Sequence, residues 1–221
     1  MKTHYQVIVV GAGPSGLATA LNLRRQGVDD ILVLEKKTFP RYKCCAGYIT
    51  NKTKTAYEQF GLDIGACHYT LIKDFNIFYQ LRGVQTIPNR FLYTNRKIDR
   101  VELDHSFFLL SKMRGIAVWE DTYIECHEPD KNQVLLNQER TVTYEYLVFA
   151  DGTTGFGSRY QPEKRRNIAM QVTFPADRRD AIGIHFGITP KGYAWVSSYQ
   201  GITNVGLTDV YTPGRDYRAV F

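Results

Sequence analysis

Apolar and polar positions at the start of the chain follow the order strand, turn, helix, strand. Residues 6–10 form a short, mostly β-branched apolar run, which is typical of a strand buried on both faces. From residue 14 to residue 26 apolar side chains recur at helical spacing, and Gly27 stands where a left-handed C-cap belongs. Residues 31–34 repeat the strand pattern. This order predicts a β-α-β unit, the building block of a parallel sheet.

The middle of the chain predicts further helices and strands. Asn51 caps a short helix that Gly61 ends, and residues 74–80 alternate like a strand before a turn at residues 82–83. Residues 101–115 have the apolar spacing of a longer helix. Four later runs predict a β-meander, with a tight turn at residues 128–132; they cover residues 116–119, 123–126, 134–136 and 144–150.

From residue 168 onward the pattern changes to spaced strands with no helix between them, which predicts an antiparallel sheet in a second lobe. These strands cover residues 168–174, 181–188, 192–198 and 203–210. The predicted fold class is α/β, with a Rossmann-like dinucleotide-binding domain, made of a parallel sheet plus the meander, and part of a β-rich substrate domain. We assign residues 1–70 and 95–165 to the first domain, and residues 71–94 and 166–221 to the second.

The turn after the first strand carries the main chemical signal. Gly11, Gly13 and Gly16 form G-x-G-x-x-G, in which the second glycine lets a pyrophosphate approach the backbone and the third lets helix and strand pack closely. Glu35 ends the second strand, ~20 residues after the motif, where a carboxylate can accept both hydroxyls of an adenosine ribose. The alternative is a purely structural turn. Because Glu35 would repel a 2′-phosphate, the site should take FAD or NAD and not NADP. Pro14, Ser15 and Lys36 join the predicted cofactor-binding residues.

Composition narrows the class of protein. The chain has 221 residues, of which 43% are hydrophobic and 13% aromatic, so it can bury a sizeable core. No signal-peptide pattern and no apolar run of roughly 18 residues occurs, so we expect a cytoplasmic protein without a membrane span. The net charge of +6 is spread over short groups, at residues 36–37, 96–97, 164–166 and 178–179. Such groups favour solvated faces or anionic lipid headgroups over nucleic acid.

The four cysteines, at residues 44, 45, 67 and 126, show no C-x-x-C or metal-ligand spacing, so we expect reduced thiols and no metal. Two of them lie in a loop at residues 36–50 that has no helical or strand periodicity. There Arg41 and Lys43 place two cations beside Cys45 and its neighbour, and Ala46 and Gly47 allow close backbone approach. A basic connection with two buried thiols would have the same sequence.

Residues 11–47, with the P-R-x-K-x-C-x-G run at residues 40–47, resemble the geranylgeranyl reductase family of FAD-dependent oxidoreductases, which have the fold of class A flavoprotein monooxygenases. The resemblance places Cys45 at the family's cysteine, which lies close to the flavin and substrate, and it implies FAD as the cofactor. Arg41, Ala46 and Gly47 then belong to the cofactor-binding loop. Ala46 and Tyr48 depart from the family's glycines.

The resemblance extends along the chain. The segment at residues 95–115 is similar to the family's R-x-x-F-D-x-x-L helix, so Arg100 is expected to reach the cofactor. A cation at a helix start also favours a nearby anion. Asp151 and Gly152 resemble the family's A-D-G motif, although an ordinary Asp-Gly turn would look the same. Tyr123 is placed with the cofactor-binding residues as well. Residues 192–207 resemble the motif that lines the family's lipid cavity, so Tyr193 and Trp195 are expected to line the substrate pocket; as the alternative, they are core aromatics.

The resemblance covers the amino-terminal part of a typical member and implies an enzyme that reduces carbon–carbon double bonds of an isoprenoid or other lipid-like substrate. Reduced flavin would deliver the hydride. An external electron donor, NAD(P)H or a reductase, would be needed, and peripheral membrane contact fits the lipid. Two alternatives remain. One is a flavin-dependent monooxygenase or hydroxylase of the same fold, and the other is a non-catalytic dinucleotide-binding module.

Overall fold

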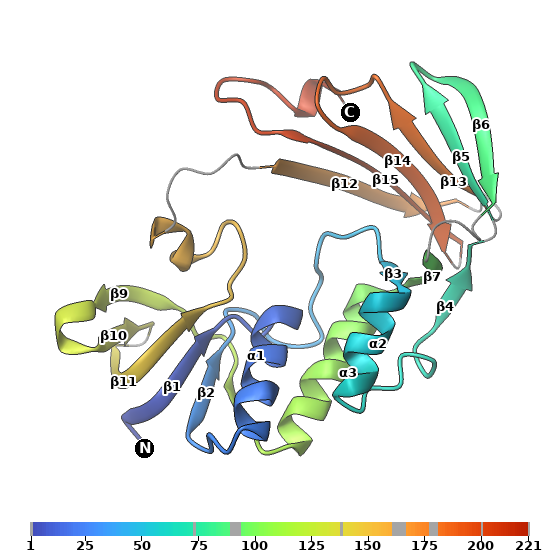
Figure 1. The fold of residues 1–221 in the computed structure, drawn as a ribbon. Coiled ribbons are helices and arrows are strands. Elements are labelled where there is room, and N and C mark those ends of the chain that lie inside the picture. The colour runs from blue at the N-terminus through green and yellow to red at the C-terminus, as the bar shows by residue number, and fades with distance from the viewer. Residues whose placement is uncertain are drawn as a thin grey trace. The chain divides into compact units, whose positions relative to one another are not determined.

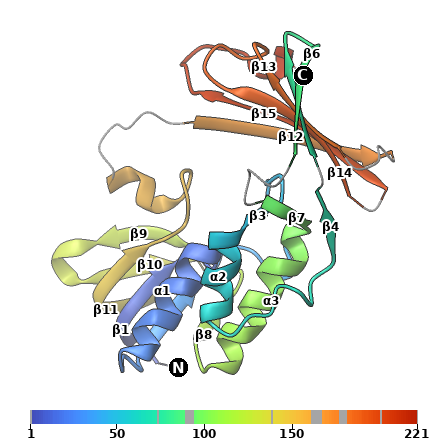
Figure 2. The same cartoon turned by 45° about the vertical axis from the view of Figure 1, so that its right-hand side comes forward.

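The computed structural model describes residues 2–72, 74–88, 94–137, 139–160, 167–176, 181–199 and 201–220. These residues form two compact units, each with its own large sheet (Figures 1 and 2). The first unit comprises residues 1–41 and 101–162, and the second comprises residues 42–100 and 163–221. Residues 42–70 and 95–100 therefore lie with the second unit, whereas the sequence had assigned them to the nucleotide-binding domain.

The first unit is built on a six-stranded sheet with the order β8-β2-β1-β11-β10-β9. Its strands are β1 (His4–Val10), β2 (Ile31–Leu34), β8 (Ala117–Trp119), β9 (Ile124–Glu128), β10 (Gln133–Leu136) and β11 (Arg140–Phe149). Strands β8, β2, β1 and β11 are parallel, while β11, β10 and β9 are antiparallel neighbours. Val10 at the end of β1 pairs with both Leu34 and Phe149. The predicted parallel sheet with a meander is confirmed.

Helix α1 (Pro14–Arg25) packs against β1 and β2 through a face that contains Gly16, Leu17, Ala20 and Leu21. Gly27 follows it with a φ of 87°, as predicted for the residue after the helix. Helix α3 (Arg100–Met113) buries Leu103, Phe107 and Phe108. The described part of this unit also contains two short 3₁₀ helices, η2 (Pro129–Lys131) and η3 (Phe156–Tyr160). The predicted tight turn between β9 and β10 is thus a 3₁₀ turn, which Asn132 closes in the left-handed region.

The second unit contains a six-stranded sheet with the order β12-β15-β14-β13-β5-β6. Its strands are β5 (Asp74–Tyr79), β6 (Arg82–Pro88), β12 (Asn167–Pro175), β13 (Ala181–Phe186), β14 (Tyr193–Tyr199) and β15 (Ile202–Val210). Figure 1 shows β12, β14 and β15 as long neighbouring strands, with β5 and β6 at the other edge. A small sheet has the order β3 (Tyr48–Thr50), β7 (Thr94–Ile98), β4 (Tyr69–Leu71). Helix α2 (Asn51–Gln59) follows β3 directly in the sequence, and η4 (Arg218–Val220) follows β15.

Three sequence predictions for this unit were wrong in detail. The large sheet is mixed and not antiparallel throughout, because β13 pairs with β5 in parallel. The turn between β5 and β6 lies at Gln80 and Leu81, both with positive φ, and residue 82 already belongs to β6. Helix α2 is capped by Thr50, whose hydroxyl oxygen accepts the backbone N–H of Thr53 at 3.1 Å; Asn51 is the first helical residue.

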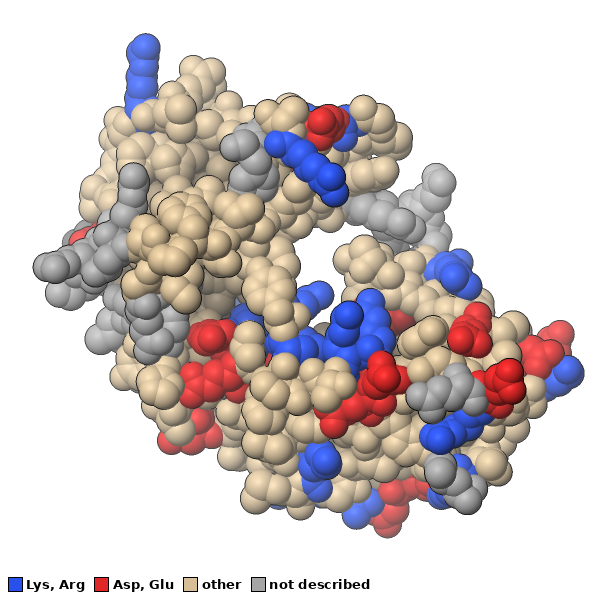
Figure 3. Space-filling view, turned by 180° about the vertical axis from the view of Figure 1, so that it is seen from behind, with Lys and Arg blue, Asp and Glu red and all other residues tan. Residues whose placement is uncertain are grey.

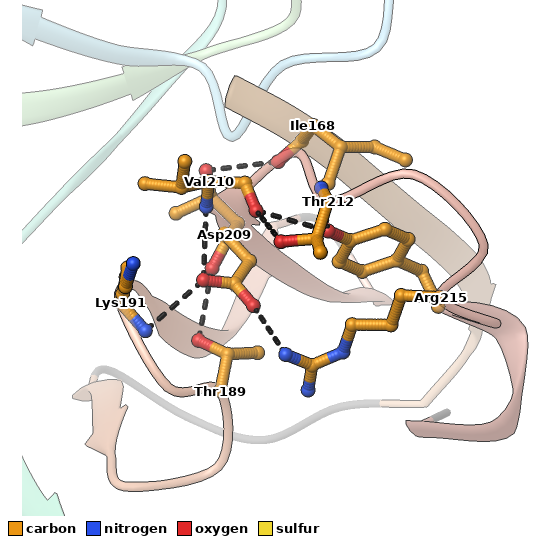
Figure 4. A network of polar contacts seen from close by, with 9 residues as sticks. Ile168, Thr189, Lys191, Asp209, Val210, Thr212 and Arg215 are labelled. Atoms are coloured by element: carbon orange, nitrogen blue, oxygen red, sulfur yellow. Dashed lines mark hydrogen bonds and ion pairs between the residues drawn. The ribbon is translucent and has the colours of Figure 1, made fainter. Parts of the chain in front are cut away.

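A network of polar contacts ties the end of β15 to the loop between β13 and β14 (Figure 4). The buried Asp209 carboxylate accepts the backbone N–H of Lys191 at 3.0 Å and pairs with the Arg215 guanidinium at 3.1 Å. The Tyr217 hydroxyl donates to the carbonyl of Val210 at 2.9 Å. The segment after β15 is therefore held against its own strand by side-chain hydrogen bonds.

Figure 3 shows basic and acidic side chains interspersed on the face it draws, without one continuous basic surface. The predicted basic groups at residues 164–166 and 178–179 lie outside the described residues, as do the side chains of residues 96 and 97. Among the helices of the described chain, none is long and apolar enough to cross a membrane.

Candidate functional site

The glycine turn lies where the carboxyl ends of β1 and β11 meet, the position at which open α/β sheets bind ligands. The Gly11 N–H donates to the carbonyl of Leu34 at 2.7 Å. A Cβ on Gly11 would come within 2.7 Å of the carbonyl oxygen of Ala150, and a Cβ on Gly16 within 1.8 Å of the carbonyl oxygen of Gly11. No side chain fits at either position, so the motif sets the close approach of α1 to the sheet.

Gly13 has a different environment. A Cβ at this position would meet only the Arg41 guanidinium, at 3.8 Å, so the backbone is open on that side. Gly13 is also the N-cap of α1, with no side-chain cap and no acidic residue in the first turn. A helix N-terminus with free N–H groups attracts phosphate, and Pro14 and Ser15 in the first turn lie beside this backbone. These residues fit a pyrophosphate.

Glu35 is held in place by backbone donors. Its side chain is buried, one carboxylate oxygen accepts the N–H of Ala12 at 3.1 Å, and the other accepts the N–H of Lys37 at 3.0 Å. A carboxylate has about four acceptor positions, so these two bonds leave room for the two hydroxyls of a ribose. Residue 36, by contrast, is exposed beyond the end of β2.

Arg41 joins two acidic residues from distant parts of the sequence. Its Nε lies 3.4 Å from a Glu35 carboxylate oxygen, and Nη1 lies 3.3 Å from a carboxylate oxygen of the buried Asp104 in α3. The guanidinium also covers the Phe39 ring at 4.7 Å. Sequence reasoning placed Arg41 in the cofactor-binding loop but did not predict these pairs. The pairs fix the guanidinium beside Gly13, where a pyrophosphate would add its negative charge.

Asp151 and Gly152 follow β11 at the same crevice. The Asp151 carboxylate accepts the N–H of Gly157 at 3.0 Å and fills the space where Gly155 would carry a Cβ. Residue 155 is therefore glycine, and the carboxylate stabilises the turn that leads into η3. The backbone of Asp151 also lies against Gly11, so a cofactor contact by Asp151 and Gly152 stays a prediction.

The part of the chain that forms this crevice matches the profile of a known protein family. The pyridine nucleotide-disulphide oxidoreductase profile matches residues 5–172, which is most of the chain. The chain belongs to this family of oxidoreductases. Among curated proteins, the oxidoreductase is 27% identical over 235 residues to an uncharacterised protein of Methanosarcina barkeri, with 98% of this chain and 56% of that protein covered. It is also 27% identical over 240 residues to a menaquinone reductase of Mycolicibacterium smegmatis, with 97% and 57% covered. The chain thus spans a little over half the length of these relatives.

Solved structures show the same fold. The flavin-dependent brominase Bmp2 matches with a TM-score of 0.74 at 21% identity, over 93% of this chain and 56% of that one. PqsL of P. aeruginosa matches with a TM-score of 0.71 at 17% identity, over 94% and 61%. The cofactor of this oxidoreductase is FAD, and its glycine turn, open helix N-terminus and buried acid fit the adenosine diphosphate half of that molecule.

The other predicted site residues of the oxidoreductase are divided between the two units: Tyr123 lies in the first, and Cys45 and Arg100 lie in the second. The half-exposed Tyr123 follows Thr122, whose N–H donates to the Glu35 carbonyl at 2.9 Å, so Tyr123 stays near the predicted ribose position. Arg100 is the first residue of α3 and falls in the second unit. Cys45 is exposed in the second unit, and its sulfur accepts the N–H of Gly47 at 3.5 Å across Ala46.

Tyr193 and Trp195 lie on one face of β14, with ring centroids 6.2 Å apart. The Trp195 indole donates to the Asn204 side chain at 2.7 Å, a bond that sequence reasoning missed because Asn204 is on the next strand. Trp195 is buried, whereas Tyr193 is exposed enough to contact a ligand. Tyr48 was noted in the sequence only as a departure from the family's glycine, and it contributes to this same part of the second unit.

Proposed function

We propose that the protein is an FAD-dependent oxidoreductase that reduces carbon–carbon double bonds of an isoprenoid or other lipid-like substrate. The observation that carries the proposal is the crevice of the first unit, in which Arg41 and backbone donors hold Glu35 beside the open Gly13 turn. The resemblance to geranylgeranyl reductases and the similarity to a menaquinone reductase over 97% of the chain support a lipid substrate. When bound and reduced, the flavin supplies a hydride.

Each predicted site residue has a role in this proposal. The backbone N–H of Gly13, the N-cap of α1, and that of Ser15 in the first turn face the pyrophosphate, while Pro14 has no N–H and shapes the turn between them. Glu35 accepts the ribose hydroxyls. Gly11 and Gly16 keep the turn tight. Further residues assigned to the cofactor are Lys36, Arg41, Ala46, Gly47, Arg100, Tyr123, Asp151 and Gly152. Cys45 is assigned to the reacting side of the cofactor, and Tyr193 with Trp195 to the substrate.

The electron donor is external in this proposal. The sequence has one G-x-G-x-x-G motif, and the FAD uses it, so NAD(P)H or a reductase protein must deliver electrons without a second motif of this kind. A lipid-like substrate would be collected at a membrane surface, and the net charge of +6 favours peripheral contact with anionic headgroups.

An anaerobic half-reaction tests the proposal. The FAD-loaded protein is reduced, a menaquinone is added, and the flavin absorbance is followed while the lipid product is weighed by mass spectrometry. We expect substrate-dependent reoxidation of the flavin and a product that carries two more hydrogen atoms in its isoprenoid chain. Reoxidation without a saturated product would contradict the proposed reaction.

A second candidate is a flavin-dependent monooxygenase or hydroxylase. Its support is the likeness to the flavin-dependent halogenase gsfI of Penicillium aethiopicum, 23% identical over 90% of this chain, and to the fold of peptidyl tryptophan dihydroxylase QhpG, with a TM-score of 0.73. When the assay is repeated in air, this activity would add an oxygen atom to the product, and it would be absent under anaerobic conditions. A non-catalytic dinucleotide-binding module would bind FAD and show no substrate-dependent reoxidation under either atmosphere.

A further inference from the structure

Tyr48 is the first residue of β3 and packs against the large sheet of the second unit. Its ring contacts a cluster formed by Ile72, Phe75 and Ile182, and its centroid lies 6.5 Å from that of Phe75 at an interplanar angle of 61°. In the geranylgeranyl reductase loop that residues 40–47 resemble, the position of Tyr48 is a glycine. The phenol is therefore a feature of this chain.

The hydroxyl of Tyr48 is buried, and its proton has no acceptor in hydrogen-bond geometry among the described residues. Buried polar groups in proteins are nearly always hydrogen-bonded, so an unpaired one indicates a partner that arrives from outside the chain. Burial raises the pKa of Tyr48 far above its usual value, and a hydrogen bond donated by the Ser197 hydroxyl to the phenol oxygen offsets only part of this rise. The phenol therefore remains protonated and can donate a hydrogen bond at any physiological pH.

The sheet face around Tyr48 combines aromatic rings with polar groups. Side chains alternate along a strand, so Ile182 and Ile184 share one face of β13, and Ile184 pairs with Trp195. Tyr193 and Ser197 alternate onto the face of Trp195. The face that carries Tyr48 is thus the face that carries the two aromatic residues of the predicted substrate site.

A second unpaired polar atom lies on this face. Gln171 in β12 pairs with Gly206, which in turn pairs with Trp195, so the three residues form one row across the sheet. The amide nitrogen of Gln171 donates to the Tyr42 hydroxyl at 2.5 Å, while its oxygen is buried without a partner among the described residues. One free donor and one free acceptor therefore accompany the aromatic rings.

We propose that Tyr48 donates a hydrogen bond to a carbonyl oxygen of the substrate, and that the substrate carries a flat, quinone-like ring packed along Tyr193 and Trp195. Flat rings stack favourably on aromatic side chains, and a quinone carbonyl is an acceptor that matches the unpaired phenol. This inference rests on the proposed function, for which it names the ring system that accompanies the lipid chain. Tyr48 acts as a positioning residue, with no bond made or broken.

Ligand binding to the oxidised, FAD-loaded protein tests the inference without turnover. The chain has two tryptophans, so Trp119→Phe leaves Trp195 as the reporter of binding by fluorescence quenching. In this background we compare Tyr48→Phe with Tyr211→Phe, a matched change at an exposed tyrosine of the same unit. The probes are menadione, which has two ring carbonyls, and methylnaphthalene, which has the same rings and no oxygen.

We expect Tyr48→Phe to raise the dissociation constant of menadione about tenfold, the effect of one lost hydrogen bond, and to leave methylnaphthalene binding unchanged. Tyr211→Phe should alter neither. The melting temperature of Tyr48→Phe should stay the same or rise, because the substitution removes a buried unpaired hydroxyl. Equal menadione affinity in both variants overturns the inference, as does a loss of both probes together with a lower melting temperature. Because the flavin stays oxidised, failure of the lipid-reduction assay would refute the proposed reaction and leave this result standing.

Discussion

Gly16 and Gly13 have different surroundings, so replacing each with alanine should have a different effect. Gly16→Ala places a methyl group within 1.8 Å of the Gly11 carbonyl oxygen, so α1 must move away from β1 and the protein should lose stability as well as FAD. Gly13→Ala meets no backbone atom, so the fold should survive while FAD affinity falls by about tenfold, since the methyl group would intrude on the pyrophosphate. Circular dichroism melting and FAD titration of the two variants separate these effects. Equal loss of stability in both would contradict the distinction.

Arg41 is a second residue whose environment allows a sharp prediction. Its guanidinium has 10% side-chain exposure and lies between Glu35 and Asp104, and Asp104 is almost fully buried. Removing one member of a buried ion pair costs about 3 kcal/mol, so Arg41→Met should lower the free energy of unfolding by this order. Adding Asp104→Leu should recover part of the loss, because Glu35, which also accepts two backbone N–H groups, is then the one carboxylate of the two that still lacks Arg41. Urea denaturation of the single and double variants measures this; an additive loss would contradict the pairing.

His127 gives the first unit a dependence on pH. Its two ring nitrogens lie 2.6 Å from the Tyr160 hydroxyl and 2.5 Å from the Tyr144 hydroxyl, and burial lowers the pKa of His127. The unfolded chain then takes up a proton at higher pH than the folded chain, so stability is complete above about pH 6.5 and falls as the pH drops through that value. The urea midpoint should fall less in His127→Gln than in the unmodified protein between about pH 7.5 and pH 5. An identical fall in both proteins would assign the effect to other groups.

At the scale of elements, the segment after β15 depends on one buried carboxylate. Asp209 accepts two backbone N–H groups and pairs with Arg215, while the side chain is 2% exposed. Asp209→Ala should lower the unfolding free energy by about 3 kcal/mol, because two part-buried N–H groups and a guanidinium lose their acceptor. Arg215→Ala is the control and should have a smaller effect, since Arg215 is 29% exposed and its loss leaves the backbone bonds intact. Chemical denaturation measures both; equal losses would contradict the assignment to the backbone bonds.

Local elements could be predicted from the sequence, whereas contacts between distant segments could not. The β1-α1-β2 unit and the strands after residue 167 follow from apolar spacing within short windows. The parallel pairing of β13 with β5 joins residues about a hundred positions apart, and neither strand alone indicates a partner or a direction. The candidate site divides in the same way. Gly11, Gly13, Gly16 and Glu35 belong to one local motif, while the Arg41 to Asp104 pair spans 63 positions.

At the scale of the whole molecule, the chain combines an FAD-binding first unit with a β-rich second unit that carries Tyr48, Tyr193 and Trp195. Membership of the oxidoreductase family indicates the cofactor, while the relatives include both a menaquinone reductase and a flavin-dependent halogenase. The second unit is where these chemistries would differ, because its side chains decide which substrate is held and how. The curated relatives are longer than this chain, which covers 56% and 57% of their length.

The affinity of the protein for FAD, measured with and without the Glu35 charge, tests most directly whether the glycine turn and Glu35 form the FAD site. FAD is titrated into the cofactor-free protein and binding is followed by quenching of flavin fluorescence, for the unmodified chain, for Glu35→Gln and for Glu58→Gln, which changes an exposed carboxylate in α2. Glu35→Gln should weaken FAD binding at least about tenfold, because a charged acceptor for the ribose hydroxyls is lost, whereas Glu58→Gln should have no effect. Equal affinity of all three proteins for FAD would contradict this assignment.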